Sequence, residues 1–165
     1  MLELDAWLEI AKSAALEGGN YLLQNQGKEL KVLMNSGRDI KLQLDTDTEK
    51  LIKESLSSHS PFSILGEETG LSDNLGEFYW VVDPLDGTSN FLREIPISCV
   101  SVALMQNIKP ILGVIYDFNH DDLYYGHKAS KAFVNHKKIT VSDYSEKNQS
   151  TLVTGIPAKT HYSDE

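Results

Sequence analysis

The hydrophobic pattern of this chain changes at Pro61, and this change restricts the folds that the chain can adopt. Before Pro61, apolar residues recur every three or four positions, as they do on one face of an α-helix. After Pro61, they form short runs separated by turn residues, which is typical of β-strands. The pattern therefore predicts an α+β domain in which two N-terminal helices pack on a largely antiparallel sheet.

The first helix is expected to begin near Leu4 and to end before Gly27. Its apolar face would consist of Trp7, Leu8, Ala11, Ala14, Ala15, Gly18 and Leu22. Gly18 and Gly19 lie inside this helix, where glycine costs stability but permits another segment to approach closely. We therefore assign both glycines a packing role.

A short strand and the second helix are expected next. Residues 40–44 follow a turn at 35–37 and alternate between apolar and polar side chains, as in a half-buried strand. The second helix is expected at residues 46–57, because Thr46 and Glu49 have the spacing of a capping box.

The second part of the chain contains seven short apolar runs that we interpret as strands. These are residues 63–65, 78–82, 98–105, 111–116, 123–125, 132–134 and 139–141. The 165 residues show no internal repeat or linker, and this length is sufficient for one domain with a hydrophobic core. We therefore expect a single domain over residues 1–165.

Charge and hydropathy disfavour some classes of partner. The formal net charge of −9 would repel nucleic acid phosphates. The longest mostly apolar stretch, residues 95–105, is too short to span a membrane. The N-terminus is acidic where a secretory signal would be basic. We expect a cytoplasmic protein that binds neither nucleic acid nor membranes, and whose single cysteine, Cys99, is a buried thiol rather than a nucleophile.

Two acidic segments directly follow predicted strands. Residues 66–70 read Gly-Glu-Glu-Thr-Gly, and residues 80–91 read WVVDPLDGTSNF. Asp83 precedes Pro84, which favours an extended backbone at Asp83 before the chain turns. Asp86 would then lie across the turn, where it could share a cation with Asp83. Oxygen ligands of this kind are typical of Mg²⁺ sites.

An anion site is expected beside these carboxylates. If Thr88 begins a short helix, the N–H groups of Gly87 and Thr88 would point at one spot. Carboxylates next to an anion site are the parts needed for metal-assisted hydrolysis of a phosphate ester. The string Asp-Pro-Leu-Asp-Gly-Thr alone is equally compatible with a surface turn.

Two other carboxylate motifs do not fit the spacing. A calcium loop would need oxygen ligands at the positions of Leu85 and Gly87. Phosphatases that form an aspartyl-phosphate place two aspartates two residues apart, whereas Asp83 and Asp86 are three apart.

The two acidic segments together resemble the signature of the inositol monophosphatase family, whose members are Mg²⁺-dependent, lithium-sensitive phosphatases with a layered αβαβα fold. Residues 42–52, LQLDTDTEKLI, and residues 129–143, ASKAFVNHKKITVSD, resemble further family segments. The resemblance covers nearly the whole chain. It implies that these residues form the N-terminal, metal- and phosphate-binding half of the family fold.

The resemblance also implies a set of metal ligands. Glu67, Asp83 and the backbone carbonyl of Leu85 would hold the first metal. Asp83 and Asp86 would hold the second. The expected cofactor is Mg²⁺, with Mn²⁺ as a substitute and Li⁺ as an inhibitor.

The resemblance further implies how the remaining residues would act. Gly87 and Thr88 would bind phosphate through their amides, while Glu67 and Thr88 would orient the attacking water. Asp45 matches an aspartate that supports the threonine, and Glu68 matches a less critical second glutamate.

The chain departs from the family pattern in two respects. It lacks the Trp-Asp-x-Ala-Ala-Gly-like segment, whose aspartate completes the second metal site and contacts the substrate hydroxyl. Ala129, Lys131 and His136 replace glycines that are usual in the later hairpin, and Asn135-His136 is a poorer two-residue turn than Asn-Gly. We therefore expect the substrate-binding C-terminal half to be absent from these residues.

The expected function is hydrolysis of a phosphate monoester of a small polyol, similar to inositol monophosphate, with impaired activity for these residues alone. One alternative is a bisphosphate nucleotidase or fructose-1,6-bisphosphatase of the same superfamily. Another is a non-catalytic Mg²⁺-binding fragment or remnant. Exposed apolar surface is also expected to favour a homo-oligomer.

Overall fold

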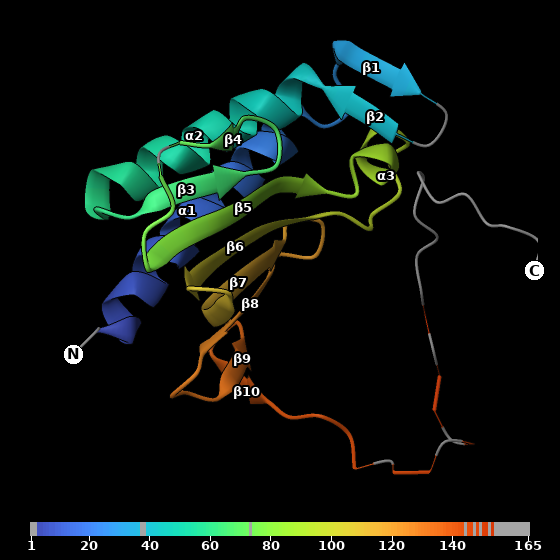
Figure 1. The fold of residues 1–165 in the computed structure, drawn as a ribbon. Helices are drawn as coiled ribbons and strands as arrows, with labels where there is room; N and C mark the ends of the chain where they lie inside the picture. The colour runs from blue at the N-terminus through green and yellow to red at the C-terminus, as the bar shows by residue number, and fades with distance from the viewer. Residues whose placement is uncertain are drawn as a thin grey trace, which may run out of the picture.

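The computed structural model describes residues 3–36, 39–72, 74–143, 145, 146, 148, 150, 151 and 153. Two long helices lie side by side on one face of an eight-stranded sheet (Figure 1). A separate two-stranded ribbon lies beyond the start of the second helix. The predicted α+β arrangement is confirmed.

The first helix, α1 (Leu4–Asn25), has the predicted buried face. A Cβ on Gly18 would lie 2.7 Å from the Ile52 side chain of the second helix. A Cβ on Gly19 would overlap the ring of Tyr116 in the sheet. The two glycines therefore let α1 approach both the second helix and the sheet, which explains their position inside a helix.

The second helix, α2 (Gln43–His59), begins three residues earlier than predicted. The preceding strand is correspondingly short, β2 (Asp39–Leu42). The predicted capping box of Thr46 and Glu49 is wrong. Instead, the Leu42 N–H donates to Asp45 Oδ2 at 2.8 Å, so Asp45 satisfies a backbone donor at the start of the helix.

The ribbon consists of β1 (Val32–Ser36) and β2, which are antiparallel. Asn35 and Ser36 pair with Ile40 and Asp39, so these two residues extend a strand rather than form the predicted turn. The third residue of that predicted turn, Gly37, lies outside the described residues.

The main sheet has the strand order β10-β9-β8-β7-β6-β5-β3-β4. Its strands are β3 (Ser63–Gly66), β4 (Gly70–Leu71), β5 (Phe78–Asp86), β6 (Cys99–Gln106), β7 (Lys109–Asp117), β8 (Asp122–His127), β9 (Ala132–Val134) and β10 (Lys137–Ile139). All seven predicted strands have a counterpart, although β10 begins and ends two residues earlier than predicted and shares only Ile139 with the predicted run 139–141. β4 was not predicted. The pairing is antiparallel except between β3 and β5.

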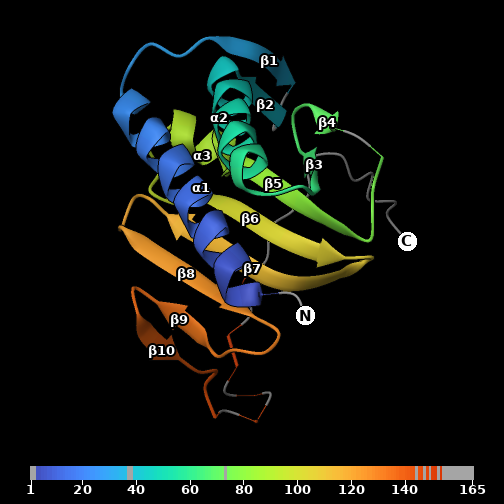
Figure 2. The same cartoon turned by 90° about the vertical axis from the view of Figure 1, so that its left-hand side faces the viewer.

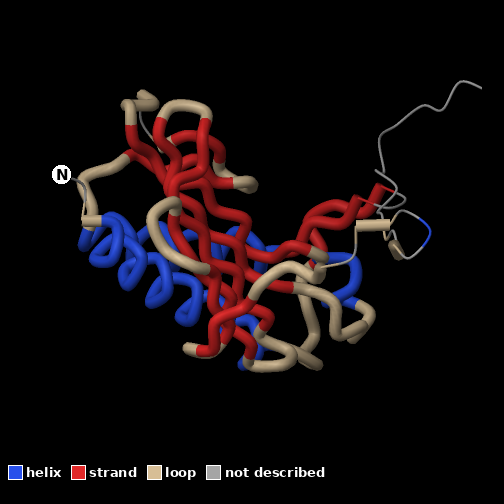
Figure 3. Tube along the Cα trace, turned by 90° about the horizontal axis from the view of Figure 1, so that it is seen from below, coloured by secondary structure: helices blue, strands red, loops and turns tan. Residues whose placement is uncertain are grey.

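The two faces of the sheet differ in what covers them. Figures 2 and 3 show both long helices gathered on the same side of the strands. On that side the sheet buries Trp80, Val82, Val100, Val102, Leu104, Val114 and Tyr116. On the other side, Ile115 and Tyr124 are 46% and 37% exposed. The hydrophobic core therefore lies between the helices and the sheet.

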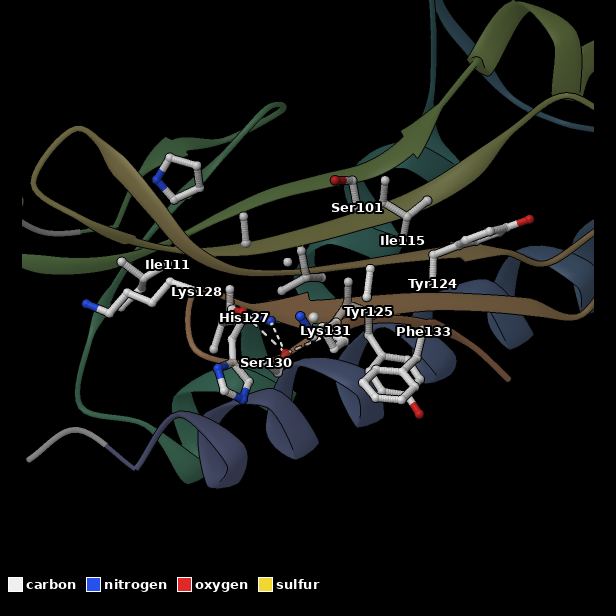
Figure 4. A pocket seen from close by; sticks show the side chains of 18 of the residues that line it. Ser101, Ile111, Ile115, Tyr124, Tyr125, His127, Lys128, Ser130, Lys131 and Phe133 are labelled. Atoms are coloured by element: carbon white, nitrogen blue, oxygen red, sulfur yellow. Dashed lines mark hydrogen bonds between the residues drawn. The ribbon is translucent and has the colours of Figure 1, made fainter. Parts of the chain in front are cut away.

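The second face of the sheet carries a pocket of about 590 Å³. Ser101, Ile115 and Tyr124 line the side formed by the sheet, and Phe133 belongs to the β9–β10 hairpin (Figure 4). In the part of the chain that is described, no helix combines the length and apolar character needed to cross a membrane.

Candidate metal centre

Glu67 and Asp83 lie beside each other because β3 and β5 are parallel. Gly66 of β3 is paired with Val82 of β5, and the residues that follow this pair are Glu67 and Asp83. The Glu67 N–H donates to the Val82 carbonyl at 3.1 Å and holds the main chain at this point. Strand register therefore brings together two predicted ligands that are sixteen positions apart in the sequence.

The environment of Asp83 is strongly negative. Burial raises the pKa of its carboxyl to about 8, with further contributions from the charge of Glu67, a hydrogen bond between these two carboxyl groups and the charge of Asp86. The Leu85 N–H donates to Asp83 Oδ1 at 3.1 Å and opposes this rise. Without a cation, Asp83 therefore retains a proton near neutral pH.

A β-bulge places Asp86 on the same face of the sheet as Asp83. Asp83 is paired with Ser101, and Asp86 is paired with Cys99. β5 thus advances three residues while β6 advances two. In a regular strand, residues three apart would point to opposite faces. The extra residue in β5 cancels that alternation.

The thiol of Cys99 is also affected by the negative charge of these aspartates. Its Sγ lies 3.9 Å from Asp86 Oδ2. Burial, followed by the charges of Asp86, Asp83 and Asp117, raises the pKa of the thiol to about 12. A thiol that keeps its proton is a poor nucleophile, in agreement with the prediction. Cys99 is only partly buried, however, whereas a buried thiol was predicted.

Gly87 directly precedes the short helix α3 (Thr88–Leu92), which begins where the predicted anion site requires. Its backbone is left-handed, with φ +89° and ψ 34°, a conformation that favours glycine. The N–H groups of Asn90 and Phe91 donate to the Gly87 carbonyl. The N–H of Thr88 precedes these bonds and is one of the groups that a helix leaves without an internal acceptor.

Thr88 lies against the turn that contains Leu85. Its hydroxyl donates to the Leu85 carbonyl at 3.1 Å, and this carbonyl is one of the predicted metal ligands. Phe91 anchors α3 to the hydrophobic core, because it is buried and packs edge-on against Phe118 with ring centroids 6.0 Å apart. The position of Thr88 is therefore supported by both the turn and the core.

Asp45 lies in the same negative region but makes a different contact from the predicted one. Its carboxyl is buried, and Oδ2 accepts the Leu42 N–H. Burial is the main reason that the pKa of Asp45 is raised to about 7, and the charges of Glu68 and Glu67 add to it. Oδ1 has no hydrogen-bond partner among the described residues. The predicted support of Thr88 by Asp45 stays a prediction.

Glu68 points toward the ribbon instead of toward Asp83. Its Oε2 lies 3.0 Å from Lys41 Nζ in an ion pair between the loop and β2. The lesser role that the family resemblance implies for Glu68 stays a prediction.

The sequence analysis missed the structural role of Glu49. Its side chain is fully buried, and it accepts hydrogen bonds from the N–H groups of Glu68 and Thr69 at 2.7 and 3.1 Å. Asp45, Thr48, Glu49, Ile52 and Leu56 all belong to the buried face of α2. Two acidic residues on an apolar helix face were the signal that could have indicated buried carboxylates.

The acidic side chains do not form a closed set of ligands. Within the described residues, no three His, Cys, Asp or Glu side chains are arranged so as to hold a metal ion. The chemistry of Glu67, Asp83 and Asp86 nevertheless fits a hard divalent cation, because they are oxygen donors, and burial followed by the charges of Glu67 and Asp86 raises the pKa of Asp83. A pocket of about 430 Å³ adjoins this group and is lined by Asp86 and Gly87, among others.

Comparison with known proteins shows the family to which the chain belongs. The model of the inositol monophosphatase family matches residues 3–163. The fructose-1,6-bisphosphatase/inositol-1-monophosphatase of Aquifex aeolicus is 38% identical over 162 residues, which are 96% of this chain and 61% of that protein.

Solved structures show the same relationship. The inositol monophosphatase of Anabaena has a TM-score of 0.76 at 37% identity, over 88% of this chain and 53% of that chain. The suppressor protein SuhB of Bartonella henselae has a TM-score of 0.79 at 35% identity, over 84% of this chain and 55% of that chain. The chain thus spans little more than half the length of these relatives. Since the family model, the relatives and the fold all agree, this chain belongs to the inositol monophosphatase family.

Proposed function

We propose that this chain provides the metal- and phosphate-binding half of a Mg²⁺-dependent phosphomonoesterase. The observation that carries the proposal is the placement of Glu67 directly after β3, next to Asp83 in the parallel strand β5, with Asp86 returned to the face of Asp83 by a bulge. Three carboxylates at one place are unfavourable unless they are protonated or bind a cation. Membership of the inositol monophosphatase family supports the choice of a cation.

In this proposal, Glu67, Asp83 and the Leu85 carbonyl hold one cation, and Asp83 and Asp86 hold a second. Together the cations would neutralise charge on the phosphate and favour loss of a proton from the attacking water. Binding would displace the proton that Asp83 retains in their absence. Mn²⁺ would substitute for Mg²⁺, because both prefer oxygen ligands.

The start of α3 would bind the phosphate. The N–H groups of Gly87 and Thr88 would donate to its oxygens, and the bare Cα of Gly87 leaves room for them. Glu67 and the Thr88 hydroxyl would orient the water. Asp45 Oδ1, which has no hydrogen-bond partner among the described residues, would then accept a hydrogen bond from the Thr88 hydroxyl if that hydroxyl turned away from Leu85.

The proposed substrate is a small phosphorylated polyol such as inositol monophosphate. The Aquifex relative is named for both fructose-1,6-bisphosphatase and inositol-1-monophosphatase, so a sugar bisphosphate is the second candidate. A nucleoside bisphosphate remains an alternative within the superfamily. The residues named in this proposal would contact only the phosphate group of any of these molecules.

The residues that hold the leaving alcohol would belong to the half of the relatives that this chain does not match. That half would also complete the second metal site. Since these contacts stabilise the transition state, their absence would lower the turnover rate. We therefore propose that residues 1–165 alone bind Mg²⁺ but hydrolyse substrate slowly.

Phosphate release tests this proposal. The 165-residue chain, its Asp86→Asn variant and a fusion to the C-terminal half of a relative would be assayed with Mg²⁺ on inositol monophosphate and fructose 1,6-bisphosphate. We expect slow release by the chain, less by Asp86→Asn and recovery by the fusion. Release that persists in excess chelator would contradict a metal-dependent mechanism, and an inactive fusion would favour a non-catalytic role.

A further inference from the structure

Glu49 is a charged residue in the interior of the protein. Its side chain is completely buried between α2 and the loop that follows β3. Buried carboxylates are costly unless several donors surround them. Glu49 has such donors, which are the N–H groups of Glu68 and Thr69, the Thr69 hydroxyl and the ammonium group of Lys53.

Gly66, the last residue of β3, lies directly against this carboxylate. A Cβ on Gly66 would lie 2.4 Å from the Glu49 carboxyl carbon, which is far inside van der Waals contact. The backbone of Gly66 is therefore packed directly on the charged group. The glycine that begins the Gly-Glu-Glu-Thr-Gly segment is explained by a residue seventeen positions earlier in the chain.

The main chain of Glu67 is held on both sides. Its own N–H donates to the Val82 carbonyl of β5. The next two N–H groups, those of Glu68 and Thr69, both donate to Glu49. Hydrogen bonds to an ionised acceptor are stronger than those between neutral groups. Glu49 thus ties the proposed metal-ligand loop to α2, the helix that also carries Asp45.

We propose that Glu49 is a positioning residue for metal binding, which fixes the loop so that the Glu67 carboxylate faces Asp83. This inference rests on the proposed function, because it assigns a metal to Glu67. The carboxylate is required because one side chain must accept hydrogen bonds from two consecutive backbone amides and one hydroxyl.

Glu49→Gln is the principal test. Glutamine has the same size, but its amide nitrogen is a donor and cannot accept from the loop. Glu54→Gln is the matched control, because Glu54 also lies on α2 and also faces a lysine four positions away, Lys50, at 3.9 Å. Its side chain is 66% exposed and, within the described part of the chain, makes no hydrogen bond or ion pair with the loop.

Two measurements on the full chain separate positioning from stability. Backbone amide exchange, followed by NMR without metal, should become about 10- to 100-fold faster at Glu68 and Thr69 in Glu49→Gln. Calorimetric titration with Mn²⁺ should show binding weaker by about 10- to 100-fold, the usual effect of losing a residue that orients a ligand. Glu54→Gln should change neither quantity.

A double-mutant cycle with Glu67→Gln tests whether Glu49 acts through Glu67. If it does, Glu49→Gln should weaken Mn²⁺ binding much less when Glu67 is already neutral. Equal losses in both backgrounds would overturn the positioning role. Should Glu49→Gln fail to fold, Thr69→Val removes one partner of Glu49 from an exposed loop position and should weaken Mn²⁺ binding in the same direction.

The outcomes also distinguish this inference from the proposed function. If the unmodified chain binds no Mn²⁺, the proposed metal site is wrong, and this inference is overturned with it. If Mn²⁺ binds and loses affinity in Asp83→Asn but not in Glu49→Gln, the metal site stands and Glu49 has only a structural role. Unchanged amide exchange at Glu68 and Thr69 in Glu49→Gln would also overturn the inference.

Discussion

A Cβ atom on residue 87 would lie 2.7 Å from the carbonyl oxygen of Ile97, so the backbone of Gly87 is in direct contact with the loop that precedes β6. Asn119 holds that loop through hydrogen bonds to the carbonyl and hydroxyl of Ser98, at 3.0 and 3.2 Å. The loop therefore has little freedom to move away from a larger side chain at position 87.

Three glycine variants should separate the causes of this constraint. Gly87 combines a positive φ with a close neighbour, Gly70 has a positive φ with open space, and Gly113 has open space and no positive φ. Gly70→Ala should lower the free energy of unfolding by about 1 kcal/mol. Gly87→Ala should lower it by more, and Gly113→Ala should have little effect. Chemical denaturation checks this order, and equal losses at positions 70 and 87 would contradict the steric argument.

Stability of the cation-free protein should depend on pH through Asp83. The pKa of its carboxyl is about 8 in the folded protein and near 3.8 in the unfolded chain, so the folded state favours the protonated form. The stabilising effect of that proton is complete below pH 3.8 and is lost as the pH rises toward 8.

Asp83→Asn should therefore gain stability relative to the unmodified chain as the pH is raised from 4 to 8 in chelator. Denaturation curves at several pH values measure this difference. Addition of Mg²⁺ at pH 8 should stabilise the unmodified chain but not Asp83→Asn. A difference between the two proteins that does not vary with pH would contradict the assignment.

The hairpin between β9 and β10 should be stabilised by His136→Gly. Asn135 and His136 have φ values of 45° and 69°, and Val134 pairs with Lys137, so the turn has two residues that both need positive φ. Glycine adopts this conformation without the cost that histidine incurs, which predicts a gain of about 0.5–1 kcal/mol.

His136→Ala is the control for that variant, because it also removes the contact of 3.3 Å between the imidazole and the Tyr125 hydroxyl. Asn135 should be retained, since its side chain bonds to the Asp121 carbonyl and the Asp122 carboxylate. Thermal unfolding should place His136→Gly above both other proteins, and a lower midpoint than that of His136→Ala would contradict the turn assignment.

The second face of the sheet should promote self-association of the 165-residue chain. Ile115 and Tyr124 expose apolar surface beside a pocket of about 590 Å³. Light scattering should show a mass that increases with protein concentration, and Ile115→Lys should reduce the increase. Ile108→Lys is the control, because Ile108 is 86% exposed in the turn between β6 and β7. A monomer at all concentrations would contradict this prediction.

Hydrophobic periodicity was sufficient to predict most of the fold. The apolar face of α1 was predicted because its apolar residues follow a period of 3.6, and the seven strands were predicted from short apolar runs separated by turn residues. The start of α2 was misplaced because Asp45 caps the helix from within the first turn, while the sequence contains a second string, Thr46 to Glu49, with the same spacing. The local sequence does not show whether the helix begins with the Leu42–Asp45 pair or with the Thr46–Glu49 pair.

The candidate site was less accessible from the sequence. Motifs identified Glu67, Asp83, Asp86 and Thr88, but their proximity depends on the parallel pairing of β3 with β5, which a largely antiparallel prediction does not contain. The role of Glu49 could not be predicted for a related reason. Its partners lie nineteen and twenty positions further along the chain, and only the tertiary fold brings them together.

The bulge in β5 limits how the segment between Asp83 and Asp86 can evolve. Substitutions at positions 84 and 85 leave the count of residues unchanged, so Asp86 stays on the side of Asp83. An insertion or deletion of one residue would reverse the alternation and turn the Asp86 carboxylate to the opposite face. The length of this segment, rather than the identity of the side chains at positions 84 and 85, therefore decides whether both aspartates lie on one surface.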